Sequence, residues 1–196
     1  MRAWADEHKN ASEVHYGDRQ GNKPTRGVGH HSGDDGKPIA SSTICGTVEA
    51  WMLLDANLRM AYLNTNPEFV KMQQLVIVKT AILNHSINCT GHNVDLARAV
   101  DITWEQLDLL EGDDWNNSEL FSNKEKAVIR WADEVSTQRA YDNDAAFEEL
   151  KKYFDTHQIV ELTFLCCMWN LSGRLTEALH LMVEPPGERI GFGCSI

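Results

Sequence analysis

The sequence lacks the cysteine patterns that would assign it at once to a class of protein. It has 196 residues and five cysteines, and no two of these form a Cys-x-x-Cys pair. The odd number and the spacings match neither a zinc ribbon nor a disulfide framework. Adjacent Cys166 and Cys167 lie in an apolar, helix-like stretch, where buried free thiols are common. We therefore expect reduced cysteines and a reducing compartment.

Positive charge and long hydrophobic runs are also scarce. Eighteen basic residues stand against 29 acidic ones, a formal net charge of −11. Such a chain repels phosphate, which argues against nucleic acid or an acidic membrane surface as a partner. The most apolar run, residues 159–169, is well short of the ~20 residues that cross a bilayer, and the first ten residues do not resemble a secretory signal. We expect a soluble, cytoplasmic protein.

Several motifs of nucleotide and metal chemistry are missing. The sequence has no glycine-rich phosphate loop and no Gly-x-Ser-x-Gly elbow, so we expect no nucleotide cofactor and no serine-hydrolase chemistry. The run 30–35 contains His30, His31 and two aspartates, side chains that suit first-row metal ions. A polar, glycine-rich loop more often leaves such groups solvated, and we predict no metal site. A site that includes His85 or His92 stays open as an alternative.

The chain divides into a loop-rich start and a helical remainder. Residues 1–46 hold seven of the thirteen glycines and two prolines, which are typical of an irregular arm. From residue 47 onward the apolar residues recur at helical spacing. We predict an N-terminal arm over 1–46, one helical domain over 47–186, and a tail over 187–196, which suits the size of a single domain.

The helical pattern predicts an all-α, compact bundle of about six to seven helices. Trp51, Leu54, Leu58 and Tyr62 mark the first helix. Later helices are predicted over 67–84, 89–100, 103–111, 122–135, 144–154 and 158–182, two of them opening with capping-box signatures, Thr-x-x-Gln and Ser-x-x-Glu. The last helix is apolar on nearly every side at its start, so we expect it to be the most enclosed element.

The segment 86–93 contains the side chains best suited to chemistry. Cys89 and His92 are three residues apart, which places them on one face of a helix. A nearby histidine can accept a thiol proton, and the thiolate is the reactive form. The start of a helix also favours negative charge. The alternative is that the two are ordinary packed or surface residues, because this spacing also arises by chance.

The stretch 74–93 resembles the signature of the carboxymuconolactone decarboxylase and alkylhydroperoxidase D superfamily. In redox members, a glutamate is followed twelve residues later by Cys-x-x-Cys and then by x-x-x-His. Stretches 122–135 and 169–179 are also similar to family helices, and the resemblance covers roughly 47–186. It implies an all-helical fold of the alkylhydroperoxidase D-like type. It also implies a homo-oligomer, a trimer or hexamer, with a dimer as the alternative.

The aligned positions depart from the redox signature. Gln74 takes the place of the glutamate, Ser86 that of the first cysteine, and Asn93 that of the histidine, while Cys89 matches the second cysteine. In peroxidase members the second cysteine attacks the peroxide and the first resolves it. Ser86 cannot form that disulfide, so an outside thiol would be required. These substitutions argue against a two-cysteine peroxidase.

The resemblance and the residues together favour acid–base chemistry. We expect a lyase, decarboxylase or isomerase type of reaction on a small oxygenated or carboxylated metabolite. His92, whose ordinary pKa is near neutral, would be the general acid or base. Cys89 would be its polar or nucleophilic partner. Ser86 and Gln74 would supply hydrogen bonds.

Three further residues are predicted to bind the substrate of this reaction. They are Asn93, His85 and Arg174, of which Arg174 would hold a carboxylate. The alternative for Arg174 is an ion pair with Glu177 that ties helices or subunits together.

Two other functions stay open. One is a one-cysteine peroxidase or thiol redox sensor in which Cys89 is oxidised. The other is a non-catalytic binding or assembly protein that keeps only the fold.

Overall fold

The computed structural model describes residues 66–181 and 183, and this part of the chain is helical with no strand. Its elements are α4 (Pro67–Leu83), α5 (Ile87–Ala99), α6 (Trp104–Leu109), η2 (Asp114–Asn116), α7 (Asn123–Ser136), η3 (Ala140–Asp142), α8 (Asp144–Leu150) and α9 (Thr156–Ala178). The all-α class is confirmed for these residues. The arm 1–46, the helix predicted around Trp51–Tyr62, the pair His30 and His31, and the tail 187–196 lie outside them. The domain range 47–186 therefore stays a prediction.

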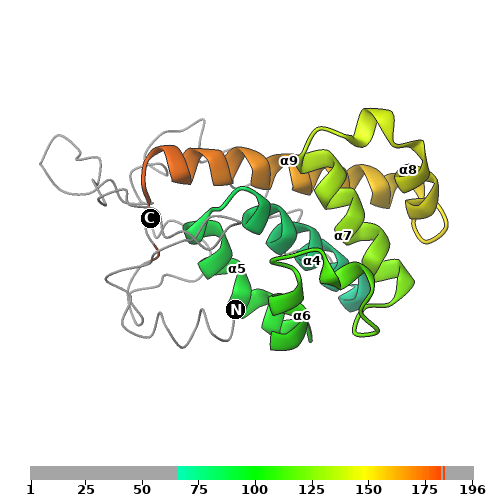
Figure 1. Ribbon diagram of the computed structural model, residues 1–196, viewed down its shortest axis with the longest axis horizontal. Coiled ribbons are helices and arrows are strands. Elements are labelled where there is room, and N and C mark those ends of the chain that lie inside the picture. Colours follow the sequence, from blue (N-terminus) through cyan, green and yellow to red (C-terminus); the bar gives the residue numbers. More distant parts are fainter. Residues whose placement is uncertain (1–65, 182, 184–196) are drawn as a thin grey trace, which may run out of the picture.

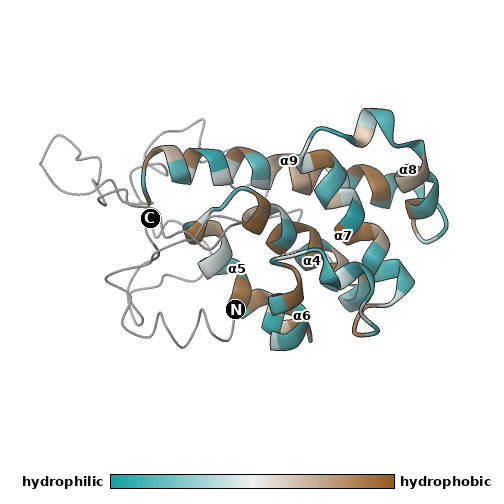
Figure 2. Cartoon of the chain, in the orientation of Figure 1, coloured by the Kyte–Doolittle hydropathy of each residue, from teal (hydrophilic) through white to brown (hydrophobic). Residues whose placement is uncertain are grey.

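Helix α4 is the centre of the described bundle. It packs against α5, α7 and α9, and Figure 1 shows it running between these helices. Every residue of α4 from Met72 to Ile82 is buried. The prediction that the last helix is the most enclosed is wrong, because apolar residues recur along α9 (Figure 2) and some of them face outward: Val160 is 62% exposed and Phe164 42%. Helix α9 carries apolar residues on faces that no neighbouring helix of the described bundle covers.

Side-chain caps fix where the helices begin. The predicted capping boxes are present, with Thr103 and Gln106 at the start of α6 and Ser122 and Glu125 at the start of α7. A further box, in which Asp155 is the N-cap, opens α9. These side chains satisfy backbone N–H groups that have no partner inside the helix.

Left-handed residues follow the ends of four of the described helices, α4, α5, α7 and α9. His85, with φ 56°, follows the C-cap of α4, and its backbone N–H donates to the Ile82 carbonyl while that of Ser86 donates to Ala81. His180, with φ 53°, ends α9 in the same way. This pattern is the Schellman motif. It corrects the predicted end of the last helix, which stops at Ala178 rather than at residue 182.

A small cluster of buried apolar residues is separate from the main core. It gathers side chains from α4, α5 and α9, namely Ile77, Ala81, Cys89, Leu165, Met168 and Trp169. The candidate thiol is therefore part of the packed interior. Within the described residues, no helix is long and apolar enough to cross a membrane.

Candidate functional site

Ser86 links the start of α5 to α9. Its hydroxyl accepts a hydrogen bond from the Cys89 backbone N–H at 3.2 Å, which makes it the N-cap of α5. The same oxygen lies 2.8 Å from the hydroxyl of Thr176, and Ser86 is only 1% exposed. Ser86 thus caps α5 and forms a hydrogen bond with α9. Its side chain lies next to the backbone of Cys89, as expected for two residues in the first turn of one helix.

Cys89 faces two hydroxyl groups of α9. Its Sγ lies 3.5 Å from the Ser172 hydroxyl and 3.8 Å from that of Thr176, and the residue is 5% exposed. The position in the first turn of α5 places the sulfur near the positive end of the helix dipole. In both contacts either atom can be the donor, and the Thr176 hydroxyl itself donates to the Gly173 carbonyl at 3.0 Å. The hydroxyl groups of Ser172 and Thr176 were missed in the sequence, where only their i, i+4 spacing on the last helix could have indicated them.

His92 turns toward its own helix rather than toward the sulfur. It is half-buried, and its Nδ1 lies 2.9 Å from the Asn88 carbonyl oxygen. A carbonyl can only accept, so Nδ1 carries the proton and Nε2 is the basic nitrogen of the neutral ring. Among the described residues, the hydrogen bonds of the Cys89 sulfur go to Ser172 and Thr176 instead. One-turn spacing therefore does not produce a Cys–His hydrogen bond.

The two amides that replace family acid–base residues are buried. Asn93 is 4% exposed, and its Nδ2 donates to the Cys89 carbonyl at 2.8 Å, so it supports the first turns of α5. Gln74, on α4, is 1% exposed, and its Oε1 has no hydrogen-bond partner in the described part of the chain. A buried acceptor without a donor is uncommon in proteins.

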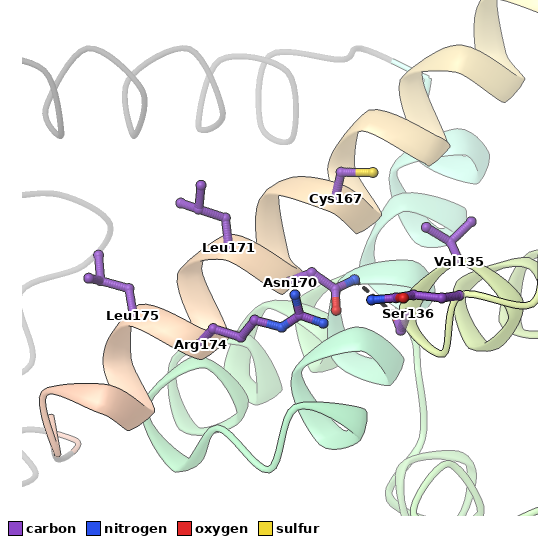
Figure 3. A pocket seen from close by; sticks show the side chains of 8 residues that line it. Val135, Ser136, Cys167, Asn170, Leu171, Arg174 and Leu175 are labelled. Atoms are coloured by element: carbon purple, nitrogen blue, oxygen red, sulfur yellow. Dashed lines mark hydrogen bonds between the residues drawn. The ribbon is translucent and has the colours of Figure 1, made fainter.

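The structure places two predicted substrate-binding residues away from the sulfur. His85 is exposed in the turn between α4 and α5. Arg174 is exposed and lines a cavity with Ser136 and Asn170, on the side of α9 that faces α7 (Figure 3). Because Thr176 lies two residues on, about 200° around the helix, Arg174 does not share its face.

Glu177 is an ionisable group near the thiol that the sequence indicated only as a possible ion-pair partner. Its Oε1 accepts a hydrogen bond from the Ile87 backbone N–H at 3.3 Å, at the start of α5. Burial raises the pKa of Glu177 above its ordinary value, against the lowering effects of that hydrogen bond and of His180. The site thus includes a carboxyl group that holds its proton more tightly than a solvated glutamate.

Metal binding has no obvious location in this part of the chain. Over residues 66–181 and 183, no three His, Cys, Asp or Glu side chains are grouped so that they could hold an ion. The remaining groups around Cys89 are hydroxyls and amides, which suit hydrogen bonding rather than tight metal coordination.

Comparison with known proteins supports the fold more strongly than any activity. No protein-family model matches the chain. The uncharacterized protein YnjA of Escherichia coli K12 is 34% identical over 76 residues, which are 39% of this chain. The match spans 42% of the length of that relative, less than half of it.

Two solved structures share the arrangement of helices. One is a protein of unknown function from Agrobacterium tumefaciens, described as a candidate AhpD antioxidant defence protein, with a TM-score of 0.63 and 20% identity over 72% of this chain and 95% of that one. The other is the debrominase Bmp8, with a TM-score of 0.61 and 13% identity over 75% of this chain and 78% of that one.

These similarities show the fold of the chain. It shares the helical fold of these two solved structures, one of which is described as a candidate AhpD protein, in agreement with the all-helical fold that the sequence resemblance implied. At 20% and 13% identity these structures share the fold with the chain, and a shared fold does not imply a shared activity.

Proposed function

We propose that the protein is a one-cysteine, thiol-dependent peroxidase in which Cys89 reduces a hydroperoxide. The observation that carries this proposal is the sulfur of Cys89 at the start of α5, facing the hydroxyls of Ser172 and Thr176. The start of a helix favours negative charge, and the thiolate is the nucleophilic form of a cysteine. The fold shared with a candidate antioxidant defence protein supports the proposal of a peroxidase.

The reaction balances without a second cysteine in the chain. The Cys89 thiolate attacks the terminal peroxide oxygen, an S–O bond forms, and the O–O bond breaks. The alkoxide that leaves takes a proton and becomes an alcohol, while the sulfur loses two electrons and becomes a sulfenic acid. A low-molecular-weight thiol then condenses with the sulfenic acid, releasing water, and a second thiol frees Cys89 as a symmetrical disulfide departs. We place this reaction in the cytoplasm, where such thiols are kept reduced.

Mass spectrometry of the full chain tests this proposal. Treatment with one equivalent of cumene hydroperoxide should add one oxygen at Cys89, and added glutathione should convert the adduct into a mixed disulfide. Cys89→Ser should abolish both, whereas the control Cys167→Ser, at an exposed thiol, should leave both intact. Ser172→Ala and Thr176→Val together should slow the oxidation about tenfold, since two stabilising hydrogen bonds are lost. An unmodified Cys89 under these conditions contradicts the proposal.

Acid–base chemistry is the second candidate, and Glu177 is the observation that favours it. A carboxyl group with a raised pKa can donate a proton, and the neutral ring of His92 can accept one. This function would release carbon dioxide from a carboxymuconolactone and would survive Cys89→Ser. The same Cys89→Ser variant therefore separates the two candidates. A non-catalytic protein would show neither reaction.

We further propose that the protein assembles as a homo-oligomer, a trimer or a hexamer. The exposed apolar side chains of Val160 and Phe164, in the first half of α9, support an interface there.

A further inference from the structure

A cavity of about 630 Å³ opens on the side of α9 away from Cys89. It lies between the end of α7 and the second half of α9, and Figure 3 shows the side chains that line it. Small-molecule sites commonly have volumes of about 300–1,000 Å³. The cavity is thus large enough for a ligand, and no role has yet been assigned to it.

One positive charge dominates the described lining of this cavity. Arg174 is exposed and makes no hydrogen bond or ion pair with any residue in 66–181 or 183. The described lining residues include no carboxylate, although the chain as a whole carries a net charge of −11. A guanidinium presents donors in a planar fork that matches a carboxylate. The cavity is therefore suited to a negatively charged ligand.

The rest of the wall is mainly apolar. Val135 comes from α7, and Leu171 and Leu175 come from successive turns of α9; Leu171 is 48% exposed and Leu175 37%. Exposed leucines beside a cavity gain from contact with a hydrocarbon chain. Apolar area and one cation together match an amphipathic anion better than a phosphate or a sugar acid.

The polar end of the cavity is held by the fold. Asn170, one turn before Arg174, donates from Nδ2 to the Ser136 hydroxyl at 3.0 Å and to the Cys166 carbonyl at 3.0 Å. Figure 3 shows Asn170 and Arg174 leaving α9 on the same side. The bond to Ser136 ties α9 to the end of α7, so the wall around Arg174 is formed before any ligand arrives.

We propose that this cavity is a binding site for an aliphatic monocarboxylate of medium chain length. The carboxylate pairs with Arg174, and the hydrocarbon chain lies against Val135, Leu171 and Leu175. The site is separate from Cys89, because Ser172 and Thr176 of α9 face the thiol whereas Asn170 and Arg174 face α7. It does not depend on the reaction proposed for Cys89.

Calorimetric titration of the full chain with sodium octanoate tests the proposal. Octanoate should bind saturably, and Arg174→Gln should weaken binding about tenfold or more, because a charge-assisted hydrogen-bond pair is lost. The matched control Arg130→Gln removes the same charge from α7, where Arg130 bonds Asn116 outside the cavity, and should change nothing. Butanoate should bind more weakly than octanoate, and 1-octanol should bind weakly and be indifferent to Arg174→Gln.

Cys167 reports on occupancy because its exposed thiol lines the same cavity. Octanoate should slow alkylation of Cys167 by iodoacetamide in the native chain and not in Arg174→Gln. As a second variant, Leu175→Glu adds a repelling charge to the wall and should abolish binding. Equal affinity in Arg174→Gln, equal binding of 1-octanol, or octanoate binding without protection of Cys167 would each overturn the proposal.

Discussion

Two buried cysteines in this bundle have different surroundings and different expected chemistry. The sulfur of Cys166 lies near the hydroxyls of Thr80 and Ser136, yet burial outweighs their hydrogen bonds and raises the pKa of the Cys166 thiol. Cys166 also sits in the middle of α9, far from a helix start. Cys89 occupies the first turn of α5 and faces Ser172 and Thr176. The reactivity proposed above is therefore placed at Cys89, and we expect Cys166 to serve only in packing.

At the residue scale, Glu177→Gln should change how stability depends on pH. Burial raises the folded-state pKa of Glu177, so between its ordinary value of 4.5 and that raised pKa the folded chain binds more protons than the unfolded chain. Stability of the native protein therefore falls as pH rises through this window. Glutamine removes this loss and keeps an acceptor for Ile87.

Urea unfolding at a series of pH values measures the effect. Glu177→Gln should be more stable than the native chain at pH 7, and the difference should shrink toward zero below pH 4.5. Glu119→Gln, at an exposed glutamate, serves as the control for a change in net charge. A Glu177→Gln protein that is less stable at pH 7 would contradict the assigned cause of the shift.

At the scale of elements, the helices are delimited by residues at their ends. Capping boxes open α6, α7 and α9. Left-handed residues follow the ends of α4, α5, α7 and α9, and His85 is the one that matters for the site, because it lets α5 begin after only three connecting residues. The short turn places Ser86 and Cys89 against α9. The geometry of the candidate site thus depends on a helix end as much as on a core.

The capping glutamate of α7 gives a prediction at this scale. Burial alone would raise the pKa of Glu125, but hydrogen bonds from Lys71, at 2.7 Å, and from Ser122 outweigh it and lower that pKa. The stabilisation is present above pH 4.5 and is lost as pH falls through the lowered pKa. Glu125→Gln should cost roughly 0.5–1 kcal/mol of unfolding free energy at pH 7, the range of a partly exposed ion pair.

The measurement is the difference in unfolding free energy between Glu125→Gln and the native chain from pH 7 down to pH 3. This difference should disappear at the acid end. Thr103→Ala, which removes the N-cap of α6, where the partner in the capping box is the uncharged Gln106, should cost about 1 kcal/mol at every pH. If the cost of Glu125→Gln were independent of pH, the carboxylate charge would not be its cause.

At the scale of the whole molecule, close approach of α9 to the end of α4 brings the site together. A Cβ added at Gly173 would lie 2.9 Å from the Cβ of Asn84, at the C-cap of α4. Glycine at 173 is therefore what lets the two helices meet here. On the same stretch of α9, Ser172 and Thr176 then come within reach of Ser86 and Cys89.

Gly173→Ala should separate these helices. The clash is with a side-chain atom next to the backbone, which cannot swing away, and overpacking of this kind costs about 1–3 kcal/mol. Better helix propensity of alanine offsets about 1 kcal/mol, so we expect a net loss of up to about 2 kcal/mol in urea unfolding. Gly112→Ala, where an added Cβ meets nothing within 4 Å, is the control and should be neutral. Equal stability of the two variants would show that Gly173 is not needed for the contact.

The sequence by itself determined most of the helices and indicated the location of the candidate site. Helix positions between residues 67 and 178 follow from apolar spacing and from capping residues such as Thr103 and Ser122, which act within one turn of the chain. Cys89 was identified through its neighbours in sequence and through the family signature. All of these features are local, and a local pattern can be read without knowing what it packs against.

Only the tertiary structure decided which groups meet. The hydroxyls of Ser172 and Thr176 reach Cys89 from more than 80 residues away, while Arg174, from the same helix, lines a cavity that does not include Cys89. His92, predicted to face the thiol, bonds its own helix instead. Which side of α9 faces α5 is set by packing and by the close approach at Gly173. Helical periodicity predicts which residues share a face of a helix, but it does not predict which other helix that face contacts.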